Sequence, residues 1–414
     1  MKMKKSLMLL ALIFCVGGVL TGCGSSKEIT FWNPFTGGDN ENLIAMIDQY
    51  NATDPEHPIK NVSMEAADMY TKIITAVNSG KDVPDLMIVH GERIQLFNDN
   101  GMLTSFDSVL AHQPNINGDN YIDAAWDIGE VDGKRLSVPM DIHSWGTYYN
   151  KELLDKYAPN ALDDEIITFD EIREIAALAE ADGIKTTATT WVKPNFLSLM
   201  SQFGGVLTEN GTDPTLDTPA TADAMNLLHG LFADGITPGD GEDNTQYFLN
   251  GELVFWPEGI WGQSLLSEAD FEWGFTNAPQ LSDNLADTVN WSSSHQFVLF
   301  NSEQRKEDKE EGIAEFLEWL RTNSIEWARA GQNPAALDIL DNAEYQEMPQ
   351  SILMSTPEQQ ATLEIFDYKY NGEVSEYLDD FGPDTVMGKM NVETFGADMQ
   401  RQVEEKIAQD SSGE

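Results

Sequence analysis

The chain has 414 residues and is strongly acidic, with 70 Asp and Glu against 24 Lys and Arg and a formal net charge of −46. This length predicts two or three domains of about 150 residues each, and the hydrophobic content is sufficient for sizeable cores. The charge excludes nucleic acid as a partner, because such affinity comes from Lys and Arg at phosphates. Two cysteines exclude a disulfide framework and a structural zinc site of the usual four-ligand kind.

The first 22 residues are typical of an export signal. Three lysines precede an apolar run at residues 6–20, which is too short to span a bilayer at about 20 residues. The run leads into a Leu-Thr-Gly-Cys sequence ending at Cys23. This resembles the bacterial lipobox, which implies cleavage before Cys23 and diacylglycerol on its sulfur; the alternative is a chance cysteine beside an ordinary cleavage site. We therefore expect a signal peptide at 1–22 and a lipidated tether at 23–27.

Strand and helix patterns alternate after the tether. Residues 28–32 predict a strand, residues 33–40 predict a loop rich in Gly and Asn, and apolar residues at helical spacing predict a helix around 43–50. The order recurs with an amphipathic helix around 70–77 and a buried strand at 84–89. This alternation predicts an α/β fold, with helices covering both faces of its sheets.

The middle of the chain contains a polar interruption. A third helix is predicted at 92–98, and residues 136–149 are strand-like apart from polar positions such as Asp141 and His143. A capping box at 168–171 predicts the start of a further helix. Polar side chains inside an apolar strand indicate a feature that requires them there.

The remaining elements extend to the C-terminus. A helix is predicted at 222–233, a short strand at 297–300, a helix around 313–320, and tail helices at 361–370 and 392–408. The length predicts two lobes rather than one core. No linker or composition shift marks a boundary, so we expect the chain to cross between the lobes more than once.

Familiar catalytic motifs do not occur in the sequence. There is no glycine-rich phosphate loop, no His-Glu-x-x-His helix and no Gly-x-Ser-x-Gly elbow. The six histidines are scattered without metal-ligand spacing, so we predict no metal site and no cofactor. A carboxylate pair for glycoside hydrolysis stays open as an alternative, because the separation that matters is spatial.

Tryptophan gives the main signal for a ligand. Six of the ten lie in or beside loops with polar residues: Trp32, Trp145, Trp191, Trp256, Trp261 and Trp291. Aromatic faces beside carboxylates and amides suit a sugar, whose C–H face stacks on the ring while its hydroxyls form hydrogen bonds. The competing interpretation for each is burial in a core.

Eight short segments, in this order, together carry a family resemblance. They are Ile29–Trp32, Ser79–Leu86, Asn100–Leu103, Asp132–Pro139, Tyr148–Leu153, Gly259–Trp261, Ala314–Leu320 and Gly331–Pro334. The chain thereby resembles the extracellular solute-binding lipoproteins of ATP-binding-cassette (ABC) sugar importers, the group that includes maltose-binding protein. The resemblance implies a two-lobed periplasmic-binding-protein-like fold, with hinge strands and a ligand cleft between the lobes.

The resemblance also implies how the chain is divided. The expected parts are lobe 1 at 28–140 plus 296–335, lobe 2 at 141–295 plus 336–414, and hinges near 141–144 and 292–295.

Ligand-binding positions follow from the same resemblance. Glu92 and Arg93 match an acid and a base near a maltose-type ligand, and Trp261 matches a stacking tryptophan. His143 stands where maltose-binding protein has a carboxylate, a departure that argues against a maltose-like ligand and leaves Asp141 to take sugar hydroxyls. Gly37 and Gly38 are candidates in the loop after the first strand, and Trp145 and His295 are candidates beside the hinges. The remaining candidates are Trp256 and Trp291 on the rim, and Asn195 in a segment that matches an acidic-Pro-aromatic segment of the family.

The functional prediction is a non-enzymatic binding lipoprotein. It would capture a mono- or oligosaccharide outside the cell, at the outer face of the bacterial cytoplasmic membrane, and deliver it as a monomer to the transmembrane subunits of an ABC permease. The alternatives are a surface-anchored hydrolase that acts on glycans and a binding protein for a non-sugar solute.

Overall fold

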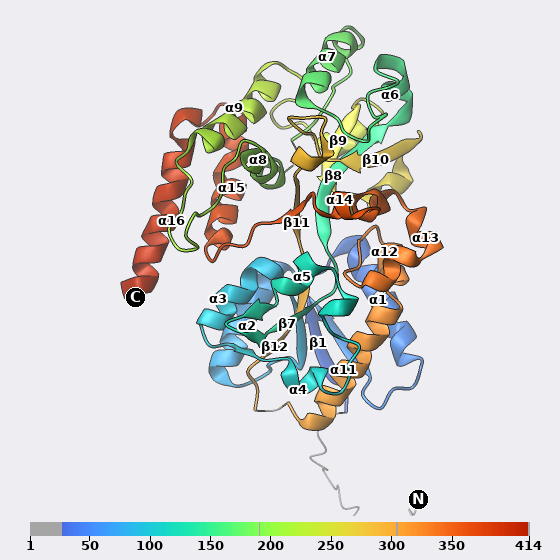
Figure 1. Ribbon diagram of the computed structural model, residues 1–414, viewed down its shortest axis with the longest axis vertical. Coiled ribbons are helices and arrows are strands. Elements are labelled where there is room, and N and C mark those ends of the chain that lie inside the picture. Colours follow the sequence, from blue (N-terminus) through green and yellow to red (C-terminus); the bar gives the residue numbers. More distant parts are fainter. Residues whose placement is uncertain (1–26, 190, 304, 413–414) are drawn as a thin grey trace, which may run out of the picture.

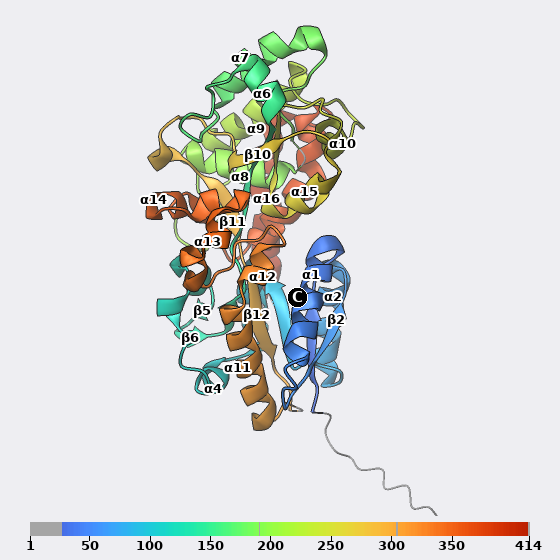
Figure 2. The same cartoon turned by 90° about the vertical axis from the view of Figure 1, so that its right-hand side faces the viewer.

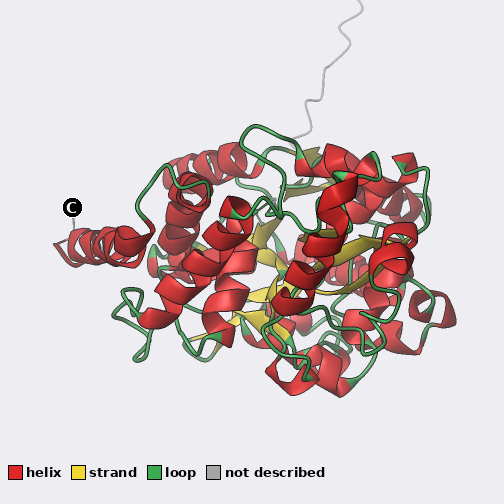
Figure 3. Cartoon of the chain, turned by 90° about the horizontal axis from the view of Figure 1, so that it is seen from above, coloured by secondary structure: helices red, strands yellow, loops and turns green. Residues whose placement is uncertain are grey.

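The computed structural model describes residues 27–189, 191–303 and 305–412. The predicted signal peptide and Cys23 lie outside these residues. Two lobes, each built on its own sheet, follow one another along the longest axis of the molecule (Figures 1 and 2). Helices surround the strands of both lobes (Figure 3). None of the described helices is long and apolar enough to span a membrane.

The first sheet has six strands in the order β2-β1-β3-β12-β4, with β7 paired to β12. Its strands are β1 (Ile29–Asn33), β2 (Ile59–Ser63), β3 (Leu86–His90), β4 (Leu103–Thr104), β7 (Ser137–Pro139) and β12 (His295–Phe300). Both faces of this sheet are buried, since Leu86 and Ile88 of β3 lie in one core and Met87 and Val89 lie in another. The covering helices include α1 (Gly37–Asn51), α2 (Ala66–Ser79) and α11 (Glu307–Thr322).

The second sheet has five strands in the order β10-β8-β11-β13, with β9 paired to β8. Its strands are β8 (His143–Asn150), β9 (Phe255–Gly259), β10 (Trp273–Asn277), β11 (Asn290–Ser293) and β13 (Leu363–Ile365). A layer of helices packs beside it and buries a separate core: α8 (Val192–Gln202), α9 (Pro219–Ala233), α15 (Asn371–Val386) and α16 (Phe395–Ser412).

Shorter elements complete the fold. The remaining helices are α3 (Ile94–Asp99), α4 (Asp107–Leu110), α5 (Asp123–Asp127), α6 (Lys151–Tyr157), α7 (Phe169–Ala179), α10 (Asn244–Leu249), α12 (Ile325–Ala328), α13 (Ala343–Gln346) and α14 (Pro357–Gln360). A small hairpin joins β5 (Glu130–Val131) to β6 (Lys134–Arg135).

Two passages of the chain between the sheets lie close together, and a third lies between β12 and β13. β7 belongs to the first sheet and β8 to the second, while β11 belongs to the second and β12 to the first. These two crossings are hydrogen-bonded to each other, because the Met140 N–H donates to the His295 carbonyl at 2.8 Å. Each of the two thus places a histidine, His143 or His295, at the first position of a strand between the lobes.

Most predicted elements are confirmed, and two need correction. The capping box is present, since the Thr168 hydroxyl accepts from the Glu171 N–H and the Glu171 carboxylate accepts from the Thr168 N–H. The loop predicted at 33–40 is shorter, because α1 already begins at Gly37. The helix predicted at 361–370 is wrong: residues 363–365 form β13, which pairs with β11, and the helix begins at Asn371.

Candidate functional site

A cleft of about 820 Å³ lies between the two sheets. Its walls come from the β1–α1 turn, α2 and the end of β3 on one side. The other side is formed by the start of α8, by β9 and by the following 3-10 helix, Ile260–Glu268. The starts of β8 and β12 form its floor. This volume is within the range of sites for small molecules.

Three tryptophans from the second lobe present their rings to this cleft. Trp191 precedes α8, Trp261 lies in the 3-10 helix after β9, and Trp291 lies in β11. The rings of Trp191 and Trp261 are 5.5 Å apart between centroids, and Trp191 is 47% exposed. The cleft therefore has apolar aromatic surface available for stacking.

Trp145 and Asn195 lie behind this surface and do not line the cleft. Trp145 is fully buried and stacks under Trp191, with ring centroids 6.2 Å apart and planes 14° apart. Its indole N–H donates to Asn195 Oδ1 at 3.1 Å, and Asn195 Nδ2 donates to the Trp191 carbonyl at 2.8 Å. The prediction that Trp145 and Asn195 contact the ligand is therefore corrected, because the two residues pack behind Trp191 and hold it in place.

Trp32 and Trp256 also need correction, because both lie in hydrophobic cores. Trp32 is 4% exposed, packs in the core that contains Met69, and carries the Lys72 ammonium 4.6 Å from its ring centroid. Trp256 is fully buried against Tyr148 and Phe248. For these two residues the competing interpretation, burial in a core, is the one that the structure supports.

The floor of the cleft is organised around Asp141, which is fully buried. Its carboxylate accepts from His295 Nδ1 at 2.8 Å, from the His295 backbone N–H at 3.0 Å, from His143 Nδ1 at 3.2 Å and from Trp327 Nε1 at 2.9 Å. Burial by itself would raise the pKa of Asp141, but the two imidazoles hold that pKa well below its usual range. The prediction that Asp141 contacts ligand is therefore corrected; the two histidines above it line the cleft.

A third histidine joins the floor from β3. His90 lies opposite His295 in the sheet, and their ring centroids are 5.0 Å apart. Burial lowers the pKa of His90, and burial together with the neighbouring His295 lowers that of His143. Burial also acts to lower the pKa of His295, but the charge of Asp141 outweighs it and raises that pKa.

Charged groups of both signs surround the floor. Burial raises the pKa of Asp39 to about 6 and that of Glu258 to about 7, so these two lining carboxyl groups hold their protons to unusually high pH. Glu92, Arg93 and Lys193 also line the cleft. The donors and acceptors needed to recognise a polar ligand are therefore present on both sides.

The turn after β1 brings two glycines to the cleft. Gly37 has a φ of +53°, which a glycine adopts readily, and begins α1. A Cβ on Gly38 would lie 3.3 Å from Ser264 Cβ in the second lobe. The lobes therefore approach each other closely at this position.

The structure brings eight of the thirteen predicted ligand-binding residues to the cleft: Gly37, Gly38, Glu92, Arg93, His143, Trp261, Trp291 and His295. Five do not line it: Trp32, Asp141, Trp145, Asn195 and Trp256. Other lining residues were missed by the sequence analysis and include Asp39, Tyr70, His90, Lys193, Glu258 and Gln332. No local motif marks them, because the cleft assembles them from distant elements.

Potential metal ligands also converge here. One ligand atom from each of Asp141, His143 and His295 lies within 4.8 Å of the others. Both ring Nδ1 atoms already face the Asp141 carboxylate at hydrogen-bond distance. The prediction of no metal site stays a prediction, and the arrangement is explained by hydrogen bonding alone.

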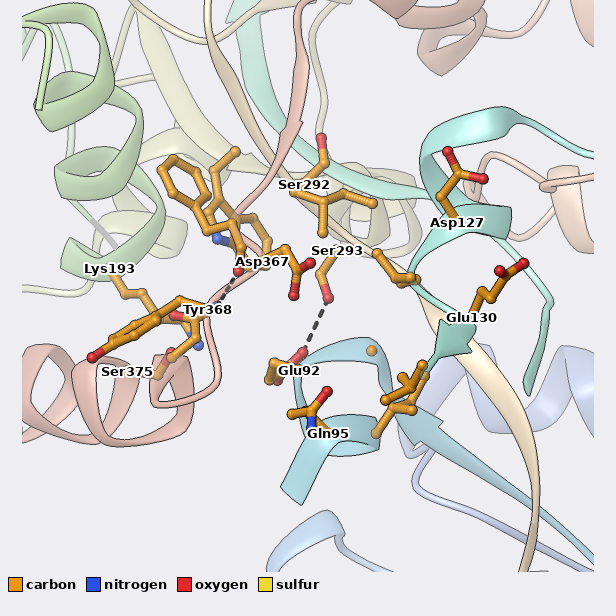
Figure 4. A pocket seen from close by; sticks show the side chains of 18 of the residues that line it. Glu92, Gln95, Asp127, Glu130, Lys193, Ser292, Ser293, Asp367, Tyr368 and Ser375 are labelled. Atoms are coloured by element: carbon orange, nitrogen blue, oxygen red, sulfur yellow. Dashed lines mark hydrogen bonds between the residues drawn. The ribbon is translucent and has the colours of Figure 1, made fainter. Parts of the chain in front are cut away.

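A second cavity of about 220 Å³ adjoins the cleft (Figure 4). It shares Glu92, Lys193, Trp291 and Ser293 with the cleft. The Ser293 hydroxyl donates to Glu92 Oε2 at 3.2 Å, which joins the second sheet to the end of β3 at the boundary of the two spaces. Lys193 and Tyr368 lie on one side of this cavity, and Asp127 and Glu130 lie on the other (Figure 4).

Two lobes, two strand crossings and a cleft between the sheets define the class of two-lobed solute-binding proteins. Residues 45–352 of the 414 match the family model described as bacterial extracellular solute-binding protein. The chain belongs to this family.

The individual relatives share low sequence identity with this chain. An arabinooligosaccharide-binding protein of Halalkalibacterium halodurans is 23% identical over 346 residues, which cover 78% of this chain and 74% of that protein. The maltose-bound MalE3 of T. maritima superposes with a TM-score of 0.76 at 17% identity, covering 91% of this chain and 99% of that one. The cyclic alpha-maltosyl-1,6-maltose binding protein of Arthrobacter globiformis gives 0.70 at 22% identity, covering 92% and 98%. These likenesses confirm the predicted fold class.

Proposed function

We propose that this protein captures a carbohydrate, most simply an oligosaccharide, in the cleft between its lobes and delivers it to an ABC permease. The observation that carries the proposal is the combination of three tryptophan rings with hydrogen-bonding groups from both lobes in one cleft of about 820 Å³. Aromatic rings stack on sugar C–H faces, and the surrounding polar groups take the hydroxyls. The relatives named for arabino-oligosaccharide, maltose and a cyclic maltosaccharide support this class of ligand.

The proposal also covers the division into lobes, the closure of the lobes and the attachment to the membrane. The lobes would divide at the two strand crossings and again after residue 335, with 28–140 plus 296–335 in one and 141–295 plus 336–414 in the other. A ligand that contacts both lobes would bind the closed arrangement more tightly than the open one. Closure would then be a shift of the population from open to closed molecules. The monomeric protein would be held at the outer face of the cytoplasmic membrane by lipid on Cys23.

A thermal-shift screen tests the proposal. The purified protein without its signal peptide would be heated with maltose, maltotriose, mannotriose, xylotriose and arabinotriose, with amino acids and short peptides as non-sugar controls. We expect at least one oligosaccharide to raise the melting temperature, because a ligand that binds the folded state stabilises it. A rise caused only by a non-sugar solute would overturn the carbohydrate assignment.

The same incubations decide between binding and hydrolysis. Asp39, Glu92 and Glu258 place three carboxyl groups around the cleft, which is the feature a hydrolase would use. A binding protein leaves the oligosaccharides intact, so we expect no shorter sugars by chromatography after prolonged incubation. Release of shorter sugars that is lost in Glu258→Gln would favour the hydrolase.

A further inference from the structure

The two histidines of the cleft floor each have one ring nitrogen fixed and one free. The fixed nitrogen is Nδ1, which faces the Asp141 carboxylate at 3.2 Å in His143 and at 2.8 Å in His295. An ionised carboxylate only accepts hydrogen bonds, so a neutral ring in this position must carry its hydrogen on Nδ1. Nε2 then has no hydrogen.

We infer that the free nitrogens are the ones that face the ligand. Asp141 is fully buried, whereas both rings line the cleft, so the ring edges directed away from Asp141 meet the open space. Among the described residues, no protein group hydrogen-bonds Nε2 of His143 or His295. Each ring, when neutral, therefore offers an unpartnered acceptor.

His90 has the opposite arrangement. The Tyr70 hydroxyl accepts from the His90 backbone N–H at 3.2 Å and lies 2.6 Å from His90 Nδ1. The phenolic hydrogen can then satisfy Nδ1, which places the ring hydrogen of His90 on Nε2. Burial raises the pKa of Tyr70, so the phenol keeps its hydrogen.

We propose that Asp141 is a positioning residue that fixes His143 and His295 as a pair of hydrogen-bond acceptors, beside the single donor of His90, for hydroxyl groups of the ligand. The proposal rests on the proposed function, since it assumes that a sugar binds in this cleft. A hydroxyl both donates and accepts, so it suits this floor, whereas a carboxylate or phosphate could not donate to the two acceptors. The floor thus selects the neutral, polyhydroxylated part of a ligand.

Long-range ¹H–¹⁵N spectra of histidine-labelled protein without ligand test the tautomers directly. The spectra are recorded at a pH at which they show the rings to be neutral, and His143→Gln, His295→Gln and His90→Gln assign the signals. His57 and His229 serve as internal references, because their Nδ1 atoms lie 2.9 and 2.8 Å from the carbonyls of Lys27 and Val386 and must carry hydrogen. We expect Nδ1–H for His143 and His295 and Nε2–H for His90.

A matched pair of variants links the tautomers to binding. In Asp141→Asn one carboxylate oxygen is replaced by an NH₂ group, which donates instead of accepting, so we expect a ring whose Nδ1 faces this group to move its hydrogen to Nε2. In Trp327→Phe the carboxylate loses one donor and both rings keep their tautomers. With maltotriose, or whichever sugar of the panel stabilises the wild type most, we expect binding at least about tenfold weaker in Asp141→Asn and nearly unchanged in Trp327→Phe.

The outcomes separate this inference from the proposed function. An Nε2–H tautomer for His143 or His295 in the wild type overturns it, and this readout stands even if Asp141→Asn does not fold. Unchanged affinity in a folded Asp141→Asn with a moved ring hydrogen also overturns it. If no sugar binds the wild type while the expected tautomers are seen, the proposed function fails instead.

Discussion

Replacing Glu258 with Gln should make the ligand-free protein more stable at alkaline pH. Glu258 lies at the end of β9 with 6% of its surface exposed, and its Oε1 accepts from the Gly259 N–H at 2.9 Å. Burial raises its pKa from the ordinary 4.5 to about 7. The folded protein therefore holds this proton more tightly than the unfolded chain does.

The sign and size follow from proton linkage. Below pH 4.5 the carboxyl is protonated in both states and has no effect, and between pH 4.5 and about 7 ionisation favours the unfolded chain progressively. A tenfold change in proton affinity corresponds to about 1.4 kcal/mol. At pH values above the pKa that Glu258 has in the folded protein, ionisation therefore lowers the free energy of unfolding by about 3 kcal/mol. In a lobe of this size, where 1 kcal/mol shifts the melting temperature by about 2–4 °C, the change would be roughly 6–12 °C.

Melting curves from pH 4 to 9, without ligand, measure this effect. The Glu258→Gln variant should match the wild type near pH 4 and exceed it increasingly up to pH 8. Glu268→Gln, at an exposed position ten residues further along the chain, is the matched control and should follow the wild type throughout. A constant difference between Glu258→Gln and the wild type at every pH would refute the linkage, because a packing effect does not depend on ionisation.

Further predictions concern the tryptophans, the anchor and the helix cap. Trp261→Ala should weaken sugar binding by about 1–3 kcal/mol in calorimetry while the circular dichroism spectrum stays unchanged. Trp256→Ala should instead destabilise the fold by about 3–5 kcal/mol in urea unfolding, since that ring is fully buried. Cys23→Ser should move the exported protein from the membrane fraction to the soluble fraction, and retention at the membrane would argue against the lipid anchor. Thr168→Ala should cost about 1 kcal/mol of stability through loss of the capping box, without changing sugar affinity.

Local patterns predicted most of the fold but not its tail. The β1 and β3 strands, the helix that ends at Gly80 and the capping box at Thr168 rest on nearby residues, so sequence reasoning reaches them. β13 is different, because its three residues become a strand only by pairing with β11, more than 70 positions earlier. Pairing over that distance leaves no local periodicity.

The candidate site was only partly predictable for the same reason. Trp256 precedes a proline and Trp261 precedes a glycine, so their sequence contexts are alike. Trp256 nevertheless lies in β9 and is buried in a core, whereas Trp261 lies in the 3-10 helix after β9 and lines the cleft. His90, His143 and His295 meet because three strands end or begin at one place between the lobes. Their spacing in the sequence carries no sign of this.

Titration calorimetry of the wild type with the panel of oligosaccharides tests the central claim most directly. The account predicts that one sugar binds per protein molecule and that the heat of binding is lost in a Trp191→Ala, Trp261→Ala double variant that remains folded. Absence of binding by every sugar of the panel, together with saturable one-to-one binding of a non-sugar solute in the same cleft, would contradict it.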